Sequence, residues 1–247
     1  MSTRGKRQVH IDALAESVFR HPDHAIVCID VLLASTTVVT AVAQGRRTLL
    51  AATPDEGRRR ARSLTNALVV GDPGTPPSEG VDPMSGPAAI EGRHDVARPL
   101  VLVSPTAQIA YNAHEAPAVY VACLRNMSAT AELLAQRHDR VALVGAGHGT
   151  EVRSEDQIVA AWIARMLIER GYEPDGLQTA REIDRWGRAD LSVVALGRGA
   201  EHLRRLGRKE DLDFVLSRID DLDVTCSFQG GEMRETWLAP VRSTAAH

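Results

Sequence analysis

The chain has few of the residues that mark secreted, disulfide-stapled or membrane-spanning proteins. It has 247 residues and only three cysteines, Cys28, Cys123 and Cys226, which lie far apart in apolar stretches and form no C-x-x-C pair. We expect reduced core thiols, which favours a cytoplasmic location. The basic, polar segment Met1–Gln8 is not followed by an apolar stretch of signal-peptide length. The sequence therefore indicates neither a signal peptide nor a membrane span.

Aromatic residues and excess positive charge are also scarce. Aromatic residues make up 4% of the chain, and the formal net charge is −3. Basic residues cluster at 58–62 and at 204–205, but both clusters lie in helix-like stretches beside acids. This pattern is typical of a solvated helix face rather than of a phosphate track. We therefore expect neither a nucleic acid nor a membrane as partner.

Several well-known catalytic motifs are absent as well. The chain has no G-x-x-x-x-G-K-[ST] phosphate loop, no H-E-x-x-H zinc motif and no G-x-S-x-G nucleophile elbow. The glycines at 145–149 break the spacing of the dinucleotide fingerprint. Asp30 is followed by Val31 and Leu32, so the second aspartate of haloacid-dehalogenase phosphatases is missing.

The chain does contain short apolar runs that alternate with helix-like patterns. These runs lie at 25–31, 48–51, 100–103, 119–121 and 141–144. Apolar runs of this length predict strands buried on both faces, and hence an α/β fold with a largely parallel or mixed sheet. We expect a leader and first short elements at 1–24, followed by a single domain at 25–240.

Local signals predict where several helices and a terminal hairpin lie. Thr53-Pro54-Asp55-Glu56 and Ser154-Glu155-Asp156-Gln157 have the order of an N-cap followed by acids in the first helical turn. The second helix should end near Gly171. Further helices are expected at 178–186, 199–206 and 211–218, whereas 190–196 is ambiguous between strand and helix. The Gly230-Gly231 turn predicts a hairpin between strands at 222–228 and 235–238, where exposed Trp or Leu side chains could make a homo-oligomer contact.

The segment 71–99 differs from the rest because proline and glycine are crowded into it. A loop of this length in a compact domain is usually either functional or disordered. Asp82 and Ser85 lie between glycines that allow backbone amides to approach a ligand closely, so we expect a functional loop.

Acids and hydroxyls at the predicted strand ends form the candidate site. Asp30 ends the first buried run and is followed by Ser35-Thr36-Thr37. Carboxyl ends of parallel strands are where open α/β sheets build sites, but Ser35 or Thr36 could instead N-cap the next helix. Together with Asp82, Asp211 and the Glu155-Asp156 pair, Asp30 offers the oxygen ligands that suit Mg²⁺. Glu155 and Asp156 could equally be first-turn acids stabilised by the helix dipole alone.

From about residue 27 to residue 227 the chain resembles the Mg²⁺-dependent 2-phosphosulfolactate phosphatases of coenzyme M biosynthesis. The resemblance rests on Ile29-Asp30-Val31-Leu32 with Ala34-Ser35-Thr36-Thr37, Gly80-Val81-Asp82 with Pro87, Ala146-Gly147 followed by Glu155-Asp156, and Leu206-Gly207 followed by Asp211-Leu212. It implies a three-layer α/β/α fold and hydrolysis of a phosphate ester on a small molecule.

The resemblance also implies roles for individual residues. Asp30, Glu155 and Asp156 would be catalytic and would hold the metal, together with Asp211. The helix start around Ser35, Thr36 and Thr37 would hold phosphate oxygens. Further substrate-binding residues would be Asp82, Ser85, Thr106 and Gln108.

The chain departs from this family where an anion should be held. Leu33 stands where the family carries an arginine, so a guanidinium able to pair with two oxygens is replaced. Met84-Ser85-Gly86-Pro87 and Pro105-Thr106-Ala107-Gln108 replace an asparagine-serine-proline and a threonine-asparagine-glycine-threonine signature, and Thr225 replaces a proline. We therefore expect a diverged member whose substrate is not 2-phosphosulfolactate itself. The alternatives are a different small-molecule reaction, with or without a metal, or a non-catalytic binding protein on the same fold.

Overall fold

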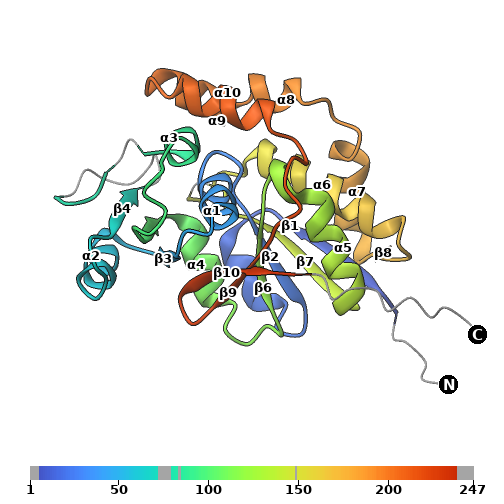
Figure 1. Cartoon of the computed structure of the whole chain (residues 1–247). Coiled ribbons are helices and arrows are strands. Elements are labelled where there is room, and N and C mark those ends of the chain that lie inside the picture. Colours follow the sequence, from blue (N-terminus) through green and yellow to red (C-terminus); the bar gives the residue numbers. More distant parts are fainter. Residues whose placement is uncertain (1–5, 72–78, 83–84, 148, 238–247) are drawn as a thin grey trace, which may run out of the picture.

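The protein is a three-layer α/β/α structure with one central sheet and helices on both faces (Figure 1). The computed structural model describes residues 6–71, 79–82, 85–147 and 149–237. The strands are β1 (Gln8–Asp12), β2 (Ala25–Ile29), β3 (Thr48–Ala51), β4 (Leu68–Gly71), β5 (Leu100–Val103), β6 (Val119–Ala122), β7 (Arg140–Gly145), β8 (Glu173–Pro174), β9 (Thr225–Gln229) and β10 (Glu232–Thr236). The α-helices are α1 (Ala34–Ala43), α2 (Pro54–Arg62), α3 (Pro87–Glu91), α4 (Pro105–Asn112), α5 (Met127–Arg137), α6 (Ser154–Ile168), α7 (Gly176–Trp186), α8 (Ser192–Leu196), α9 (Arg198–Arg205) and α10 (Lys209–Ser217). Two 3₁₀ helices, η1 (Ala15–Arg20) and η2 (Leu124–Asn126), complete the described elements.

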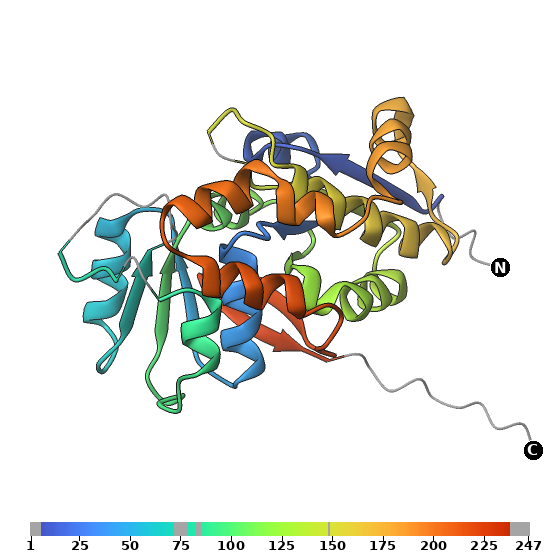
Figure 2. The same cartoon turned by 90° about the horizontal axis from the view of Figure 1, so that it is seen from above.

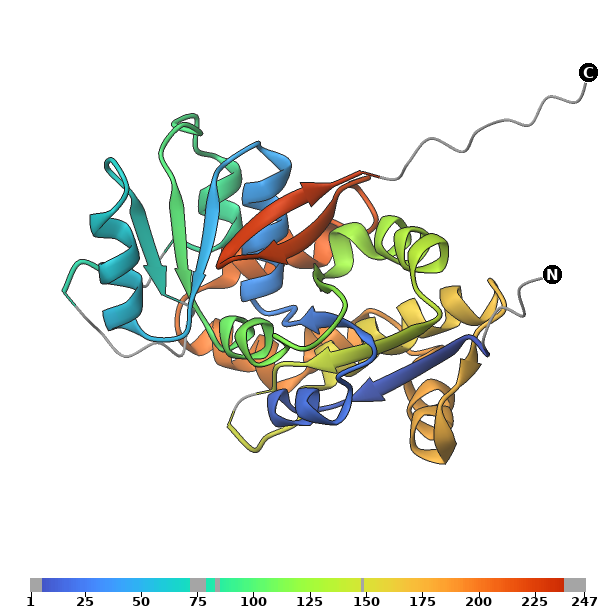
Figure 3. The ribbon, with the colours of Figure 1, turned by 90° about the horizontal axis from the view of Figure 1, so that it is seen from below.

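The sheet consists of two parallel blocks joined by an antiparallel hairpin. Its strand order is β4-β5-β3-β10-β9-β6-β2-β7-β1-β8. The block β6-β2-β7-β1-β8 pairs in parallel, as does the block β4-β5-β3. The β9–β10 hairpin, drawn in red, lies between them with antiparallel pairing on each side (Figure 3). The prediction of an α/β fold with a largely parallel or mixed sheet is confirmed.

Strand β2 shows why the apolar runs form the middle layer. All five of its residues are buried, and successive side chains of a strand point to opposite faces. Val27 and Ile29 pack in the core cluster that includes residues of α5 and α6. Ile26 and Cys28 pack on the other face, in the cluster that includes residues of α1 and α4. Burying an aliphatic side chain of this size stabilises the fold by roughly 1.5–3 kcal/mol.

The two predicted helix caps had different outcomes. The Thr53 side chain accepts a hydrogen bond from the Glu56 amide at 3.2 Å, and Pro54 begins α2, as predicted. The prediction for Ser154 is wrong, because α6 begins at Ser154 and Arg153 occupies the N-cap position without a side-chain cap. The Ser154 hydroxyl lies 3.3 Å from Glu155 Oε2. A carboxylate is a stronger acceptor than a neutral group, so the hydroxyl donates to it.

The N-terminal region contributes to the sheet. Strand β1 pairs in parallel with β7, from Gln8 opposite Arg140 to Asp12 opposite Val144. The first short elements predicted at 1–24 therefore belong to the same sheet as the rest of the chain. Residues 1–5 of the predicted leader lie outside the described residues.

The predicted loop at 71–99 is only partly irregular. It contains the helix α3, and Asp82 forms an isolated parallel bridge with Val70 at the end of β4. Residues 72–78 and 83–84 of this segment lie outside the described residues. The ambiguous stretch 190–196 forms the short helix α8.

The C-terminal hairpin exists, but its second strand begins earlier than predicted. Gly230 and Gly231 both have positive φ, 59° and 88°, and form a two-residue turn, so β10 begins at Glu232 rather than near residue 235. Trp237, directly after β10, is 69% exposed. A homo-oligomer contact there stays a prediction, and Leu238 lies outside the described residues.

The three cysteines are free and buried, which confirms the expected core thiols. Within the described ranges, no helix combines the length and the apolar character needed to cross a membrane. A cytoplasmic location stays a prediction.

Candidate active site at the carboxyl ends of β2 and β7

The site lies where two neighbouring parallel strands end. Asp30 directly follows β2, whose last residue pairs with Gly145, the last residue of β7. The helices α8, α9 and α10 cross over this edge of the sheet (Figures 1 and 2). The start of α6 contributes Glu155 and Asp156 to the same edge, because the Asp156 carboxylate accepts hydrogen bonds from the turns after both strands.

Asp30 is held by its own turn and by α4. Its side chain is buried, and Oδ2 accepts a hydrogen bond from the Thr106 hydroxyl at 3.2 Å. Its amide donates to the Ser35 hydroxyl at 2.9 Å, and its carbonyl accepts from the Ser35 amide at 2.8 Å. These bonds fix the direction in which the carboxylate leaves the strand.

The three hydroxyls after Asp30 do not cap α1, so the N-cap alternative is wrong. Leu33 is at the N-cap position, and Ser35, Thr36 and Thr37 are buried in the first turn. Thr36 and Thr37 donate to the carbonyls of Val31 and Leu33, at 2.9 and 3.0 Å. These hydroxyls therefore hold the turn together, and their expected contact with phosphate stays a prediction.

Asp156 joins the two strand ends. Its Oδ1 accepts from the Val31 amide at 2.9 Å, and its Oδ2 accepts from the Gly147 amide at 3.3 Å. Val31 follows β2 and Gly147 follows β7. A single buried carboxylate thus satisfies backbone donors of both turns, which brings it beside Asp30.

Glu155 is enclosed by the helices above the sheet. Its side chain is buried, and a methyl group added to Gly199 in α9 would overlap Glu155 Oε1. Gly199 is therefore required by close approach rather than by an unusual backbone angle. Gly145, on the other side, would meet Gln157 and Asp156 if it carried a Cβ.

The three acids share a low-dielectric space, and this raises their pKa values. Burial is the main cause for each. The charge of Glu155 also raises the pKa of Asp30, and the charges of Asp30 and Glu155 raise that of Asp156. The guanidinium of Arg153 opposes this effect at Asp30 and at Glu155. Perturbed carboxylates that meet in this way are typical of functional sites.

The donor atoms of the three acids are of the kind that a hard divalent cation takes. Asp30, Glu155 and Asp156 offer only oxygen atoms, and three buried carboxylates raise one another's pKa because their charges are incompletely compensated. Mg²⁺ is usually held by one or two carboxylates with waters and substrate phosphate. These three residues are the ones that would hold such an ion, and metal binding would favour their ionised forms. Among the described residues, one oxygen from each of the three does not come within 4.8 Å of the others, so binding a single ion with all three would require side-chain movement.

Asp211 makes contacts away from these acids. Its Oδ2 is 2.7 Å from Arg208 Nε, and its Oδ1 accepts from the Ala88 amide at 3.1 Å. The carboxylate thus binds the first turn of α3 and pairs with a buried arginine. Its role as a metal ligand stays a prediction.

The remaining predicted substrate residues are spread over two elements. Ser85 donates to the Asp82 carboxylate, and Asp82 is tied to β4 by backbone hydrogen bonds with Val69 and Gly71. Thr106 reaches Asp30, as described above. Gln108 is exposed and donates to Asn112 within α4 at 2.9 Å, so the structure does not bring it to the acids.

Leu33 lies in the apolar core, at 1% exposure, in the cluster that also contains Leu124 and Leu212. The expectation that this position faces an anion-binding pocket is therefore wrong. A side chain at the N-cap of a buried helix can point into the core as readily as toward the strand edge, and the sequence pattern did not distinguish the two.

Sequence reasoning missed a cleft beside Glu155 that is rich in arginine. The cleft has a volume of about 730 Å³, and its lining includes Glu155, Arg153, Arg185 and Arg198. Arg153 and Arg198 both lie near the Glu151 carboxylate, at 3.5 and 2.7 Å. The sequence offered one signal for these arginines, which is their nearness to residues around Glu155. Arg153 directly precedes the helix start that carries Glu155, and Arg198 directly precedes Gly199, which lies against the Glu155 side chain.

Comparisons of the sequence with known proteins identify its family. The family model for 2-phosphosulpholactate phosphatase matches residues 10–231. A probable 2-phosphosulfolactate phosphatase of Deinococcus radiodurans is 32% identical over 84% of this chain and 88% of its own length. Proteins with the same description in Synechococcus sp. (strain CC9605) and Synechocystis sp. are 30% and 32% identical, over 78% and 82% of this chain and 82% and 88% of their own lengths. With these matches and the carboxylates gathered at one edge of the sheet, the chain belongs to the 2-phosphosulfolactate phosphatase family.

Proposed function

We propose that the protein is a Mg²⁺-dependent phosphatase that hydrolyses the phosphate ester of a small anionic metabolite. The proposal is carried by one observation: in a member of this family, the buried carboxylates of Asp30, Glu155 and Asp156 lie at the carboxyl ends of β2 and β7, near enough to raise one another's pKa values. Family membership supports the reaction class, and the oxygen-only donors support the metal.

In this proposal different neighbouring groups hold each of the three acidic side chains in place. Asp30 is oriented by the Thr106 hydroxyl, and Asp156 is fixed by the Val31 and Gly147 amides. Glu155 is held against Gly199 and faces the cleft. When bound to these carboxylates, Mg²⁺ would polarise a phosphoryl oxygen and lower the pKa of a water. The Thr106 hydroxyl and the two backbone amides orient the carboxylates of Asp30 and Asp156 before substrate arrives, which reduces the reorganisation that the reaction requires.

The cleft beside Glu155 is the proposed seat of the substrate. Guanidinium groups bind phosphate or carboxylate with two parallel hydrogen bonds. Arg153, Arg185 and Arg198 line the cleft together with Glu155. A small anion bound to these groups would place its phosphoryl end near the acids. The cleft helices α6, α7 and α8 would limit the size of the molecule.

We also propose that the substrate differs from 2-phosphosulfolactate. Leu33 packs in the core and has no bearing on the pocket. The chain still departs from the family at the segment 84–87 and at the start of α4, where Pro105 is at the first helical position. There Thr106 already donates to Asp30, so the departures change what surrounds the acids rather than the acids themselves.

The test is phosphate release from a panel of phosphorylated metabolites that includes 2-phosphosulfolactate. We expect turnover that requires Mg²⁺ and falls at least roughly 100-fold in Asp30→Asn, because carboxylates of this kind contribute on the order of 10²–10⁴ in rate. Glu132→Gln is the matched control, since Glu132 is exposed on α5 and contacts Gln136 in its own helix.

Two results would contradict the proposal. Equal turnover by the parent and by Asp30→Asn would remove the acids from the reaction. Absence of turnover on every phosphate ester would favour a binding protein or a different reaction. Preferred turnover of 2-phosphosulfolactate would leave the phosphatase mechanism in place and refute only the difference in substrate.

A further inference from the structure

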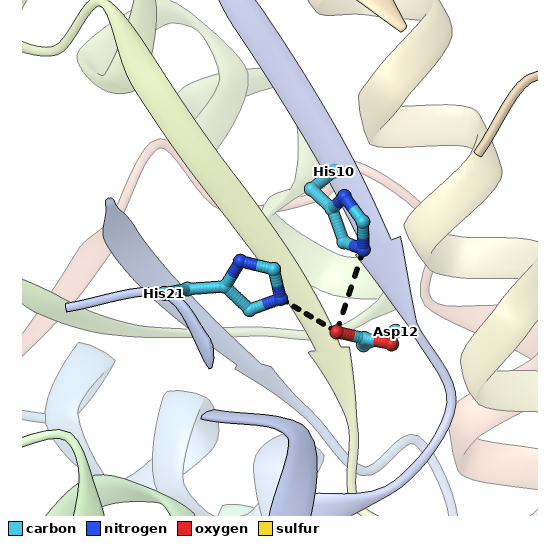
Figure 4. A group of neighbouring side chains, drawn as sticks. All are labelled: His10, Asp12 and His21. Atoms are coloured by element: carbon cyan, nitrogen blue, oxygen red, sulfur yellow. Dashed lines mark hydrogen bonds and ion pairs between the residues drawn. The ribbon is translucent and has the colours of Figure 1, made fainter. Parts of the chain in front are cut away.

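A second cluster of metal-binding side chains lies at the end of β1, in the region that sequence reasoning treated as a leader and first short elements. His10 and Asp12 are two residues apart on β1, so their side chains point to the same face of the sheet. His21 follows η1 and completes the group (Figure 4). Asp12 Oδ2 lies 2.6 Å from His21 Nε2 and 3.4 Å from His10 Nε2. One ligand atom from each residue lies within 4.8 Å of the others.

Two ring nitrogens around this cluster are buried and unsatisfied. His10 Nδ1 and His24 Nε2 have no hydrogen-bond partner among the described residues. The His24 side chain is only 3% exposed, and its ring packs edge-on against that of His21, with 5.0 Å between the centroids. Asp175 Oδ2 lies 3.8 Å from His10 Nδ1 and 4.0 Å from His24 Nε2. Buried polar groups without partners are uncommon and call for an explanation.

We propose that His10, Asp12 and His21 bind a divalent transition-metal ion of the zinc class. Imidazole nitrogen with one carboxylate suits zinc and similar ions, whereas Mg²⁺ prefers oxygen alone. Each histidine presents its Nε2 toward Asp12, which leaves His10 Nδ1 directed at Asp175. A carboxylate on the far nitrogen of a ligating histidine orients the ring and raises its basicity, so Asp175 is a positioning residue. His24 borders the cluster and is available as an additional nitrogen donor.

This site is separate from the acids at β2 and β7 and shares no residue with them. It would link β1 to the turn after η1, because His10 and Asp12 come from the strand and His21 from the turn. The carbonyl of Ala13, next to Asp12, packs against the turn that contains Gly145 and Gly147. The ion would therefore have a structural role and hold the N-terminal elements beside the loop that binds Asp156.

The experiment uses the full chain without a histidine tag, stripped with a chelator and titrated with Zn²⁺ in excess Mg²⁺. The Mg²⁺ keeps the acid cluster from competing for zinc. Calorimetry should give one zinc ion per chain, and Co²⁺ should give visible absorption typical of nitrogen ligands. We expect affinity to fall by roughly 100-fold or more in His10→Ala and in His21→Ala, and by about 10- to 100-fold in Asp175→Asn.

His114→Ala is the control, because His114 is exposed on the surface after α4, and it should keep parental zinc binding. Circular dichroism of each variant separates lost ligands from lost folding, and the Co²⁺ spectrum of the parent tests the site even where a variant fails to fold. The proposal is overturned if the parent binds neither Zn²⁺ nor Co²⁺, or if His21→Ala binds zinc as tightly as the parent. The cluster would then be a hydrogen-bonded histidine–aspartate network only.

Discussion

Two clusters of polar side chains lie at neighbouring strands of the same sheet, and they differ in chemistry. The cluster at β2 and β7 has three carboxylates, Asp30, Glu155 and Asp156, whose pKa values are raised by burial. The cluster at β1 has one carboxylate between two imidazoles, and the pKa of Asp12 is lowered because His10 and His21 hydrogen-bond to it and offset the effect of burial. The first set is suited to a hard ion and to phosphate chemistry, the second to a borderline ion and to holding the fold.

The largest expected effect comes from separating the two clusters by their metals. Asp156→Asn should lower Mg²⁺-dependent phosphate release by roughly 1,000-fold, because it removes a charge from the acids and puts an amide group near the Gly147 donor. The same variant should keep the zinc stoichiometry of the parent. Asp213→Asn, which removes an exposed carboxylate paired with Lys209, should change neither. Loss of zinc binding in Asp156→Asn would show that the clusters are not independent.

A smaller effect is expected from a methyl group placed against Glu155. Gly199→Ala should lower kcat by roughly 100-fold, since displacing a catalytic group by about 1 Å can cost this much. The added Cβ would overlap Glu155 Oε1 and would lie 3.2 Å from Leu32 Cδ1, so the Glu155 carboxylate would have to move. Gly207→Ala, where a Cβ would meet no atom within 4 Å, is a control for space but adds backbone strain at φ 71°. Unchanged kcat in Gly199→Ala would mean that Glu155 takes no part in the reaction.

The acid cluster should also make stability depend on pH in the chelator-treated protein. The pKa of Asp30 is raised to about 6 by burial and by Glu155, from 3.8. The unfolded chain loses this proton first, so stability is fully present below about pH 4 and is lost as pH rises through 6. We expect a loss on the order of 2 kcal/mol, measured by urea unfolding between pH 4 and 7. Mg²⁺ should restore the lost stability.

Asp30→Asn provides the comparison for this titration. Its free energy of unfolding should fall less than that of the parent over the same range, because the group that titrates is gone. Since Glu155, Asp156 and Arg153 face Asp30, part of the dependence should remain. Identical pH profiles for the two proteins would contradict the assignment of the raised pKa to Asp30.

The smallest expected effect concerns the hydroxyl that orients Asp30. Thr106→Val keeps the shape of the side chain and removes the donor 3.2 Å from Asp30 Oδ2. That hydrogen bond lowers the pKa of Asp30, so its loss should move the acid limb of the pH–rate profile to higher pH and lower kcat by about 10-fold. Thr106→Ser should restore both. A profile that does not move in Thr106→Val would leave Thr106 with a packing role only.

The sequence predicted the regular part of the fold well. Runs such as 25–31 and 141–144 are apolar at consecutive positions, and such runs are buried on both faces wherever they pair. Strand β1 was not assigned because its residues alternate between polar and apolar over only five positions, and its partner β7 is more than 120 residues away. The Ser154 prediction was wrong because the helix begins one residue earlier than the capping pattern indicates, which places Ser154 at the first helical position.

The candidate site was predicted in part. Asp30 and the Glu155-Asp156 pair could be named because they stand where a predicted strand ends and a predicted helix begins. Their meeting depends on the register between β2 and β7, which no local pattern encodes. The direction of Leu33 and the exposure of Gln108 depend on how α1 and α4 rotate against the sheet, and the sequence gives only their spacing.

By itself, the sequence determined the alternation of buried strands with helices, the family resemblance, and the position of Asp30 at a strand end. These follow from local periodicity and from short motifs, which act over a few residues. Only the tertiary structure decided that Asp156 joins two turns, that Leu33 lies in the core, and that His10, Asp12 and His21 meet. The reason is that these contacts are set by strand pairing and helix packing between distant segments, whose free energy comes from burial rather than from local preference.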